Sequence, residues 1–266
     1  MLKEVTLGQF FPGNTFLHRL DPRTKILFVI GYIVALFLAK SWASYALMGV
    51  VLIVALVLSR IRVKTILSGL KPILIIILFT GILNLFFTSG EPVVQFWVLT
   101  ITREGIRAAV TMVLRIVMLI TGTLLLTYTT SPLSLTDGLE SLLKPLKKIK
   151  VPVHELAMMM SIALRFIPTL IDETDKIMSA QTARGAEFDT GTLTQRAKAL
   201  IPLLVPLFIS AFRRADELAV AMESRCYHGD SGRTRMKVLT MAGRDWGTLV
   251  YEAAMIVGVV LLAPIG

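Results

Sequence analysis

Hydrophobic residues along the chain collect in blocks that approach or reach the length of a lipid bilayer. A helix needs about 20 predominantly apolar residues to span the hydrocarbon core. The predicted spans are 26–39, 41–59, 72–90, 108–130 and 247–266. The first span is short, but Lys25 and Lys40 flank it and their aliphatic stems can extend toward the interface. The pattern therefore predicts an all-α, polytopic membrane protein with about five transmembrane helices.

The chain between the fourth and fifth predicted spans differs from the rest. It carries 16 Lys+Arg and 13 Asp+Glu among apolar runs that are shorter than a span. We therefore expect a membrane domain of four transmembrane helices, a cytoplasmic domain of amphipathic helices that ends in two long helices, and a final transmembrane helix. The predicted ranges of these regions are 1–130, 131–246 and 247–266.

The distribution of basic residues predicts how the chain is oriented in the cell membrane. Four Lys or Arg precede the first span and four lie between the second and third, whereas the other two connections carry one and two. Basic residues concentrate in cytoplasmic loops, so we expect the amino terminus inside. Five spans then place residues 131–246 in the cytoplasm and the carboxyl terminus outside.

A competing topology adds residues 156–171 and 199–212 as two further spans. Arg165 interrupts the first of these segments, and the second is 14 residues long with two prolines. Their connector would also carry four basic residues to the outside, against the positive-inside rule. Length and charge both favour the topology with five spans.

The composition agrees with a membrane protein and argues against several kinds of site. Of 266 residues, 55% are hydrophobic and 17% are charged, whereas a soluble domain has about 25% charged residues. We attribute the net charge of +10 to cytoplasmic loops in contact with the bilayer surface and not to nucleic-acid binding. One cysteine and three histidines far apart predict no disulfide framework, metal site or cofactor. No phosphate-binding G-x-x-x-x-G-K-[ST] loop or catalytic triad is recognisable, so we do not expect an enzyme.

Two stretches of the central segment form an internal repeat with an offset of 41 residues. Each has a stripe at the i, i+3, i+4, i+7 spacing of one helix face. The first stripe is Ile167, Leu170, Ile171, Thr174, Ile177, Met178 and Gln181, and the second is Phe208, Ala211, Phe212, Ala215, Leu218, Ala219 and Met222. Asp172 and Glu173 correspond to Arg213 and Arg214, which carry the opposite charge. We expect the two helices to cross with these four residues paired; chance alignment of two amphipathic helices is the alternative.

One arginine, Arg115, lies inside the fourth predicted span, roughly 12 Å from its start. Intramembrane arginines usually face protein or a water-filled cavity and find a partner there. The acidic residue in the fifth span, Glu252, enters from the opposite side and is expected to be too shallow to reach it. Backbone carbonyl groups or water are therefore the expected partners of Arg115.

Each repeat ends in an arginine between two small residues, in the triplets Ala183-Arg184-Gly185 and Ser224-Arg225-Cys226. Further motifs are ALRFIP at 163–168, LDPRTK at 20–25 and MESRCY at 222–227. Together these motifs resemble the transmembrane coupling subunit (T component) of energy-coupling factor transporters, the vitamin and metal importers of the ABC class. The resemblance spans nearly the whole chain, and the paired triplets are its most specific part.

The resemblance implies a non-catalytic membrane subunit that works with two ABC-type ATPases and a small membrane substrate-binding (S) subunit. Each long helix would then be a coupling helix whose terminal arginine, Arg184 or Arg225, enters a groove on one ATPase. The alternative is that each arginine only caps carbonyl groups at its own helix end. Met158, Met159 and Met160 are expected to offer apolar surface to the S subunit, because methionine adapts to different partners. For these methionines, burial within the chain is the alternative.

The second triplet departs from the family pattern because a cysteine stands where the first has glycine. Gly185 can adopt the left-handed conformation that ends a helix, but Cys226 adopts it less easily. We therefore expect the second helix to run on or to stop one turn differently. The competing function is a secondary carrier that moves a small solute by itself. Carriers need repeats across their spans, and this repeat lies outside the predicted spans.

Overall fold

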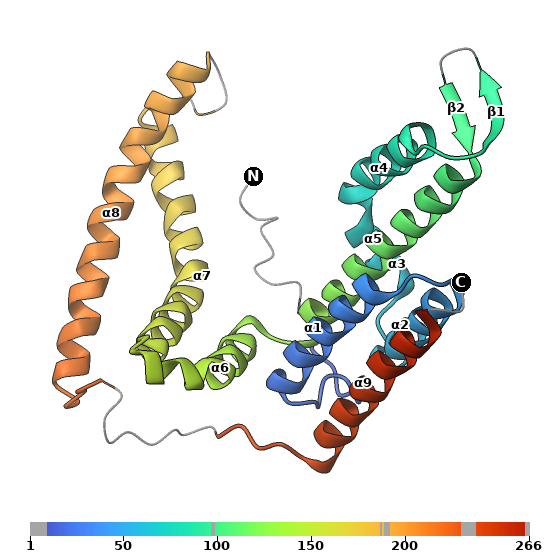
Figure 1. Cartoon of the computed structure of the whole chain (residues 1–266). Coiled ribbons are helices and arrows are strands. Elements are labelled where there is room, and N and C mark those ends of the chain that lie inside the picture. The colour runs from blue at the N-terminus through green and yellow to red at the C-terminus, as the bar shows by residue number, and fades with distance from the viewer. Residues whose placement is uncertain (1–9, 97–98, 187, 189–191, 230–237, 264–266) are drawn as a thin grey trace. The chain divides into compact units, whose positions relative to one another are not determined.

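A computed structural model describes residues 10–96, 99–186, 188, 192–229 and 238–263. From the amino end, the elements are α1 (Pro22–Leu38), α2 (Trp42–Ser59), α3 (Val63–Leu70), the 3-10 helix η2 (Lys71–Ile73), α4 (Leu74–Phe87), β1 (Pro92–Phe96) and β2 (Leu99–Thr102). They are followed by α5 (Arg103–Thr129), α6 (Pro132–Leu143), the 3-10 helix η3 (Lys144–Ile149), α7 (Val153–Ala183), α8 (Leu193–Glu223) and α9 (Gly243–Leu262) (Figure 1). The prediction of an all-α polytopic membrane protein is confirmed.

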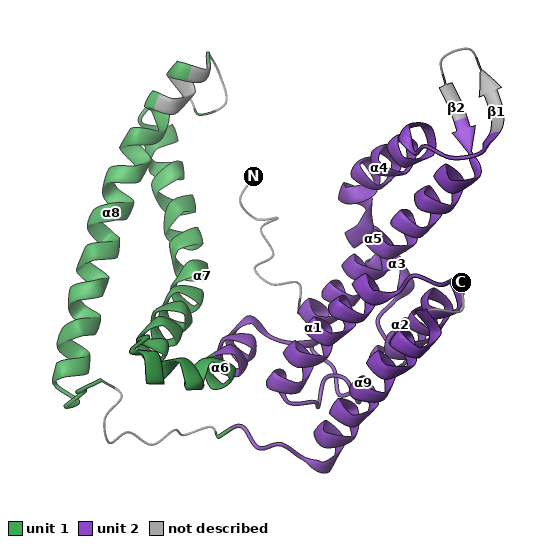
Figure 2. Ribbon diagram, viewed as in Figure 1, with its two compact units in different colours: residues 1–7, 140–238 green, residues 8–139, 239–266 purple. Residues whose placement is uncertain are grey.

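The chain forms two compact units (Figure 2). We call residues 8–139 with 239–266 the membrane unit, and residues 140–238 the hairpin unit. The membrane unit holds α1 to α5 and α9, and the hairpin unit holds α7 and α8. The range 131–246, predicted as a separate region, contains the whole hairpin unit.

The core of the membrane unit lies where α1 and α2 meet α5 and α9. Helix α1 begins at Pro22 because the Asp21 side chain accepts a hydrogen bond from the backbone N–H of Arg23, and proline suits the first helical position. Helix α4 packs along α5, and α1 packs along α9 and α5. The buried core residues are Tyr32, Ala35, Leu36, Ala39, Tyr45, Met48, Val51, Leu52, Leu125, Met255 and Val259.

Five helical stretches of the described chain are long and apolar enough to cross a membrane: α2, Val63–Phe87, α5, α7 and α9. These differ from the predicted spans in two ways. Helix α1 has 17 residues, about 26 Å, and is not among the five. Helix α7 is long and apolar enough to cross a membrane, although its charged residues predicted a cytoplasmic position.

Two local features of the membrane unit also differ from the hydrophobic pattern. The third predicted span starts at residue 72, but the helical stretch starts at Val63, because η2 joins α3 to α4 without a break. Between α4 and α5 the chain forms an antiparallel pair of short strands, β1 and β2, with Phe96 opposite Leu99. The hydrophobic pattern did not indicate these strands.

The hairpin unit is built on two antiparallel helices of 31 residues each, α7 and α8. Helix α8 turns Leu203, Leu207, Ser210, Arg214 and Leu218 toward α7, and these residues are buried or half-buried. The predicted second stripe only partly coincides with this face. Phe208, Ala211, Phe212, Ala215 and Ala219 are exposed, so most of that stripe does not pack against α7.

Candidate functional site

The first arginine triplet lies where α7 ends. The backbone N–H of Gly185 donates to the carbonyl of Thr182 and the N–H of Ala186 donates to the carbonyl of Gln181, both at 3.0 Å. These two bonds, with Gly185 at φ +88°, form a Schellman motif, which satisfies carbonyl groups at a helix end. Arg184 is the C-cap residue of α7.

The second triplet ends α8 in the same way. The N–H of Cys226 donates to the carbonyl of Glu223 at 2.9 Å, and the N–H of Tyr227 donates to the carbonyl of Met222 at 3.1 Å. Cys226 has φ +56°, so it occupies the left-handed conformation although it is not glycine. The expectation that cysteine would let α8 run on or stop differently was wrong. Arg225 and Arg184 therefore hold the same position in the same motif, 41 residues apart.

Both arginines present free guanidinium groups. Arg184 and Arg225 are exposed, as are the small residues beside them: Ala183, Gly185, Ser224 and Cys226. Among the described residues, neither guanidinium group makes a hydrogen bond or an ion pair. The described structure thus contains no bond from either guanidinium to a carbonyl of its own helix, the contact that the capping alternative requires.

The two arginines lie at opposite ends of the helix pair. Near the connection between the helices, the side-chain amide of Gln181 donates to the carbonyl of Pro202 at 3.4 Å. At the other end, the hydroxyl of Tyr227 donates to the sulfur of Met158 at 3.1 Å. Arg184 follows Gln181 and Arg225 precedes Tyr227, so the two are separated by most of α7. At 1.5 Å per residue, this is roughly 40 Å.

One of the two predicted charge pairs forms between the helices. A guanidinium nitrogen of Arg214 lies 2.5 Å from a carboxylate oxygen of Glu173, and the Ser210 hydroxyl donates to the other oxygen of the same carboxylate. Both charged side chains are partly buried, with 29% and 22% of their surface exposed. Asp172 and Arg213 are exposed and make no ion pair within the described chain. The structure therefore brings together Glu173 and Arg214 but not their neighbours.

The three methionines at the start of α7 have different surroundings. Met158 is half-buried and accepts the hydrogen bond from Tyr227. Met159 and Met160 are 54% and 47% exposed. Only Met159 and Met160 therefore offer a free apolar surface.

Helix α8 carries an exposed apolar face that sequence reasoning did not single out as a site. The face, which we call the α8 apolar face, contains Ile201, Leu204, Val205, Phe208, Ile209 and Phe212. All six side chains are at least 48% exposed and they line a shallow hollow, with Arg213 and Asp216 at one end. The sequence did contain an indication of this face, because the apolar residues of α8 cover more of its surface than one partner helix can bury. Phe208 and Phe212 of the second stripe belong to the face.

The intramembrane arginine is held by α1 and α2. The guanidinium of Arg115 on α5 donates to the hydroxyl of Tyr45 at 2.6 Å and to the carbonyl of Ala39 at 3.3 Å. It also lies 5.7 Å from the centre of the Phe37 ring, a favourable cation–π distance. A backbone carbonyl was among the expected partners. The Tyr45 hydroxyl and the Phe37 ring were not among the expected partners.

Hydrogen bonds from the LDPRTK motif connect the start of α1 to the start of α9 and to the residues just before it. The backbone N–H of Asp21 donates to the carboxylate of Asp245 at 2.8 Å. Arg23 donates to the Asp21 carboxylate at 3.1 Å and to the carbonyl of Leu239 at 2.8 Å. Because Leu239 is the first residue after the hairpin unit, the motif fixes the point where the chain re-enters the membrane unit.

The described residues contain no group of three or more His, Cys, Asp or Glu side chains placed to hold a metal ion.

Comparison with known proteins identifies relatives over nearly the full length of the chain. The sequence model of the CbiQ family, described as cobalt transport protein, matches residues 13–237. The chain is 54% identical over 260 residues to the energy-coupling factor transporter transmembrane protein EcfT of Thermosediminibacter oceani, covering 98% of each chain. It is 56% identical over 248 residues to the protein of the same name from Clostridium kluyveri, covering 92% of each.

A third protein of that name, from Bacillus subtilis, is 48% identical over 251 residues, which cover 94% of this chain and 95% of the relative. The arginine triplets and the LDPRTK motif thus occur in a chain whose similarity to these proteins extends over the membrane unit and the hairpin unit alike. The chain belongs to the CbiQ family, together with the T components of energy-coupling factor transporters.

Proposed function

We propose that the chain is the non-catalytic coupling subunit of an energy-coupling factor importer of the ABC class. In this role it links ATP hydrolysis by two partner ATPases to movement of a membrane S subunit that takes up a vitamin or another micronutrient. The observation that carries the proposal is the pair of exposed arginines in equal Schellman motifs at opposite ends of α7 and α8. Two sites roughly 40 Å apart suit two ATPase subunits.

The helix ends are suited to binding an acidic groove. Arginine is permanently charged, and its planar fork of donors matches the geometry of a carboxylate. The carbonyl groups at a helix carboxyl end carry partial negative charge, and this charge stabilises the guanidinium groups of Arg184 and Arg225 at these positions. The flanking small residues let an ATPase surface approach the backbone closely. Each triplet therefore works as one contact, with the arginine as its anchor.

Coupling follows from the arrangement of the two helices. Arg184 and Arg225 lie at opposite ends of one helix pair, in which Glu173 on α7 forms an ion pair with Arg214 on α8. When the two ATPases move relative to each other, they displace the two helix ends in different directions. The pair then turns about this contact, and the exposed surfaces along α7 and α8 move with it.

The S subunit docks on those exposed surfaces. The α8 apolar face is one candidate surface, and Met159 and Met160 add apolar surface at the start of α7. Loosely packed apolar contacts of this kind suit a partner that must bind and leave during transport. In this arrangement the hairpin unit lies on the cytoplasmic side, the amino terminus is inside and the carboxyl terminus is outside, as the distribution of basic residues indicates.

The test is copurification. The tagged chain, expressed in a bacterium together with its candidate partner subunits, is solubilised, and the chains that accompany it are identified by mass spectrometry. We expect two ATPase chains and one small membrane protein. Arg184→Glu with Arg225→Glu should lose the ATPases and keep the membrane partner, whereas Lys176→Ala, an exposed cation on α7, should keep both. Purification of the wild-type chain without any ATPase would contradict the proposal.

A further inference from the structure

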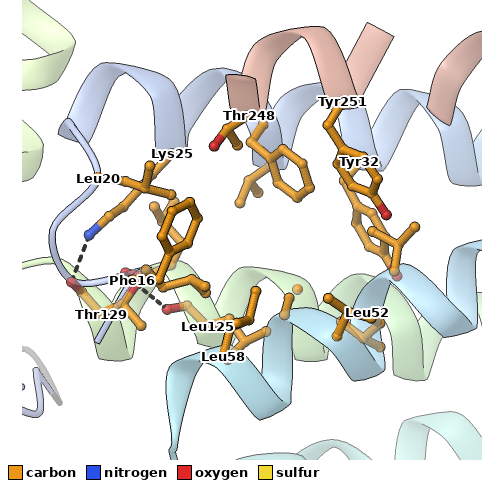
Figure 3. A pocket seen from close by; sticks show the side chains of 18 of the residues that line it. Phe16, Leu20, Lys25, Tyr32, Leu52, Leu58, Leu125, Thr129, Thr248 and Tyr251 are labelled. Atoms are coloured by element: carbon orange, nitrogen blue, oxygen red, sulfur yellow. Dashed lines mark hydrogen bonds between the residues drawn. The ribbon is translucent and has the colours of Figure 1, made fainter. Parts of the chain in front are cut away.

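The membrane unit contains a cavity of about 460 Å³ between α1, α2, α5 and α9 (Figure 3). Its walls are mainly aliphatic and aromatic side chains. They include Phe16, Leu20, Phe28, Leu52, Leu125 and Tyr251. Nothing in the proposed coupling role uses this cavity.

The cavity lies at one end of the membrane unit. Its lining residues come from the segment before α1, from α1 up to Tyr32, from the first half of α9 and from the second halves of α2 and α5. Lys25 and Arg244 lie at its outer end, and Tyr32 lies two helical turns further along α1, roughly 10 Å deeper. With the amino terminus inside, this depth corresponds to the headgroups and upper acyl chains of the cytoplasmic leaflet.

The cavity opens sideways between α2 and α9. These helices touch at their far ends, where the Ser44 hydroxyl lies 3.4 Å from the carbonyl of Val259. Beside the cavity, Val54, Leu58 and Tyr251 remain 43% to 48% exposed. An apolar opening that faces the hydrocarbon region is accessible to lipid chains and unfavourable for water.

The outer end of the cavity carries a surplus of basic groups. Lys25 is buried and donates to the carbonyl of Thr129 at 2.9 Å. Arg244 lines the cavity, is exposed, and its guanidinium makes no hydrogen bond or ion pair in the described part of the chain. Arg19 and Arg60 lie within two residues of lining residues and are also exposed.

The acidic groups at this end are already bonded within the protein. Asp21 accepts hydrogen bonds from Arg23, and Asp245 accepts hydrogen bonds from the backbone N–H groups of Asp21 and Ala242. The positive charge of Arg244 therefore has no acidic partner among the residues that the structure describes. A basic rim above an apolar cavity complements a lipid that has a negative headgroup and an acyl chain.

We propose that this cavity binds one acyl chain of an anionic phospholipid from the cytoplasmic leaflet, with the phosphate at Arg244. The lipid fills the wedge between α2 and α9, which the protein's own side chains leave open. The bound lipid thereby contacts both the start of α9 and the other helices of the membrane unit, and stabilises their packing.

The experiment uses the full chain in nanodiscs that contain phosphatidylcholine and phosphatidylglycerol. After extraction in mild detergent, native mass spectrometry counts the phospholipids retained per chain. We expect one phosphatidylglycerol on the wild type. Gly247 lines the cavity and a side chain there meets open space, so Gly247→Phe should fill the cavity and lose the lipid. Gly243→Phe, one turn earlier on α9 and outside the cavity, should retain it.

A second variant tests the headgroup. Arg244→Gln should lower the preference for phosphatidylglycerol over phosphatidylcholine about fivefold, the effect of one cation near an anionic surface. Ala55→Leu, a smaller filling change on α2, replaces Gly247→Phe if that variant does not fold. The proposal is wrong if the wild type retains no phospholipid, if the filled variants retain it as the wild type does, or if Arg244→Gln leaves the preference unchanged.

Discussion

The residue that follows each of the two triplet arginines turns the chain away from the helix axis. Gly185 and Cys226 both have positive φ, and this leaves Arg184 and Arg225 as the last residues before the turn. Sequence reasoning identified both triplets but misjudged Cys226, because the preference of the left-handed conformation for glycine is only about 1 to 2 kcal/mol. The two hydrogen bonds of the Schellman motif outweigh that cost.

A prediction for stability follows at these two positions. Cys226→Gly should raise the free energy of unfolding by about 1 kcal/mol, because glycine adopts the positive φ without strain. Gly185→Ala should lower it by a similar amount for the same reason. Thermal unfolding of the purified chain measures both changes. A lower midpoint for Cys226→Gly would show that α8 does not end in this conformation.

The side chain of Arg184 should act through its fork of donors as well as its charge. Arg184→Lys keeps the charge but loses the bidentate geometry. Its affinity for the ATPases should therefore fall between those of the wild type and Arg184→Ala in a pull-down titration. Equal affinities of the lysine variant and the wild type would mean that charge alone matters.

At the scale of the elements, helix geometry explains why half of the predicted pairing forms. Neighbouring residues on a helix point about 100° apart, so Asp172 and Glu173 cannot both face α8. Glu173 lies at the contact with Arg214, and Asp172 points elsewhere. The repeat in the sequence indicated the position of the crossing but not which member of each charged doublet faces inward.

The contact between Glu173 and Arg214 gives a prediction for coupling. Glu173→Arg alone places two cations together and should reduce transport per ATP hydrolysed, whereas Glu173→Arg with Arg214→Glu should restore most of it. The change in stability should be only about 1 kcal/mol, because the pair is partly exposed. Asp172→Asn is the matched control and should have no effect. If the double reversal transports no better than the worse single variant, the pair is not the pivot.

The apolar stripes show a limit of pattern analysis. Periodicity reveals that a helix face is apolar, but it does not reveal what covers that face. On α7 the stripe packs toward α8, while on α8 much of it remains exposed as part of the α8 apolar face. A contact between two helices buries only a narrow strip of each. The remainder is left for a partner, the bilayer or solvent.

For the whole molecule, the all-α membrane fold could be predicted from hydrophobicity, whereas the cytoplasmic position of the central segment stays a prediction. Helix α7 illustrates the difficulty that remains. Its apolar content meets the criteria for a span, whereas Arg165 and the basic connector that follows it favour the cytoplasm. The cavity beside Arg244 could not be predicted, because it arises from the splaying of helices distant in sequence.

The topology makes a prediction that the single cysteine can report. Cys226 is exposed and lies beside Arg225, so it should be cytoplasmic and covered by an ATPase in the complex. A membrane-impermeant maleimide should label it in inverted vesicles but not in right-side-out vesicles. Labelling in inverted vesicles should decrease when the ATPases are added. Labelling of right-side-out vesicles would overturn the topology.

The central claim is that Arg184 and Arg225 transmit force from the ATPases. The most direct measurement is the transport and ATP hydrolysis of the purified complex that carries Arg184→Ala with Arg225→Ala. Loss of one partner of a buried charge pair costs about 2 to 5 kcal/mol, so we expect either loss of the ATPases or hydrolysis that no longer drives transport. An assembled complex in which both activities stay at the wild-type level would contradict the account.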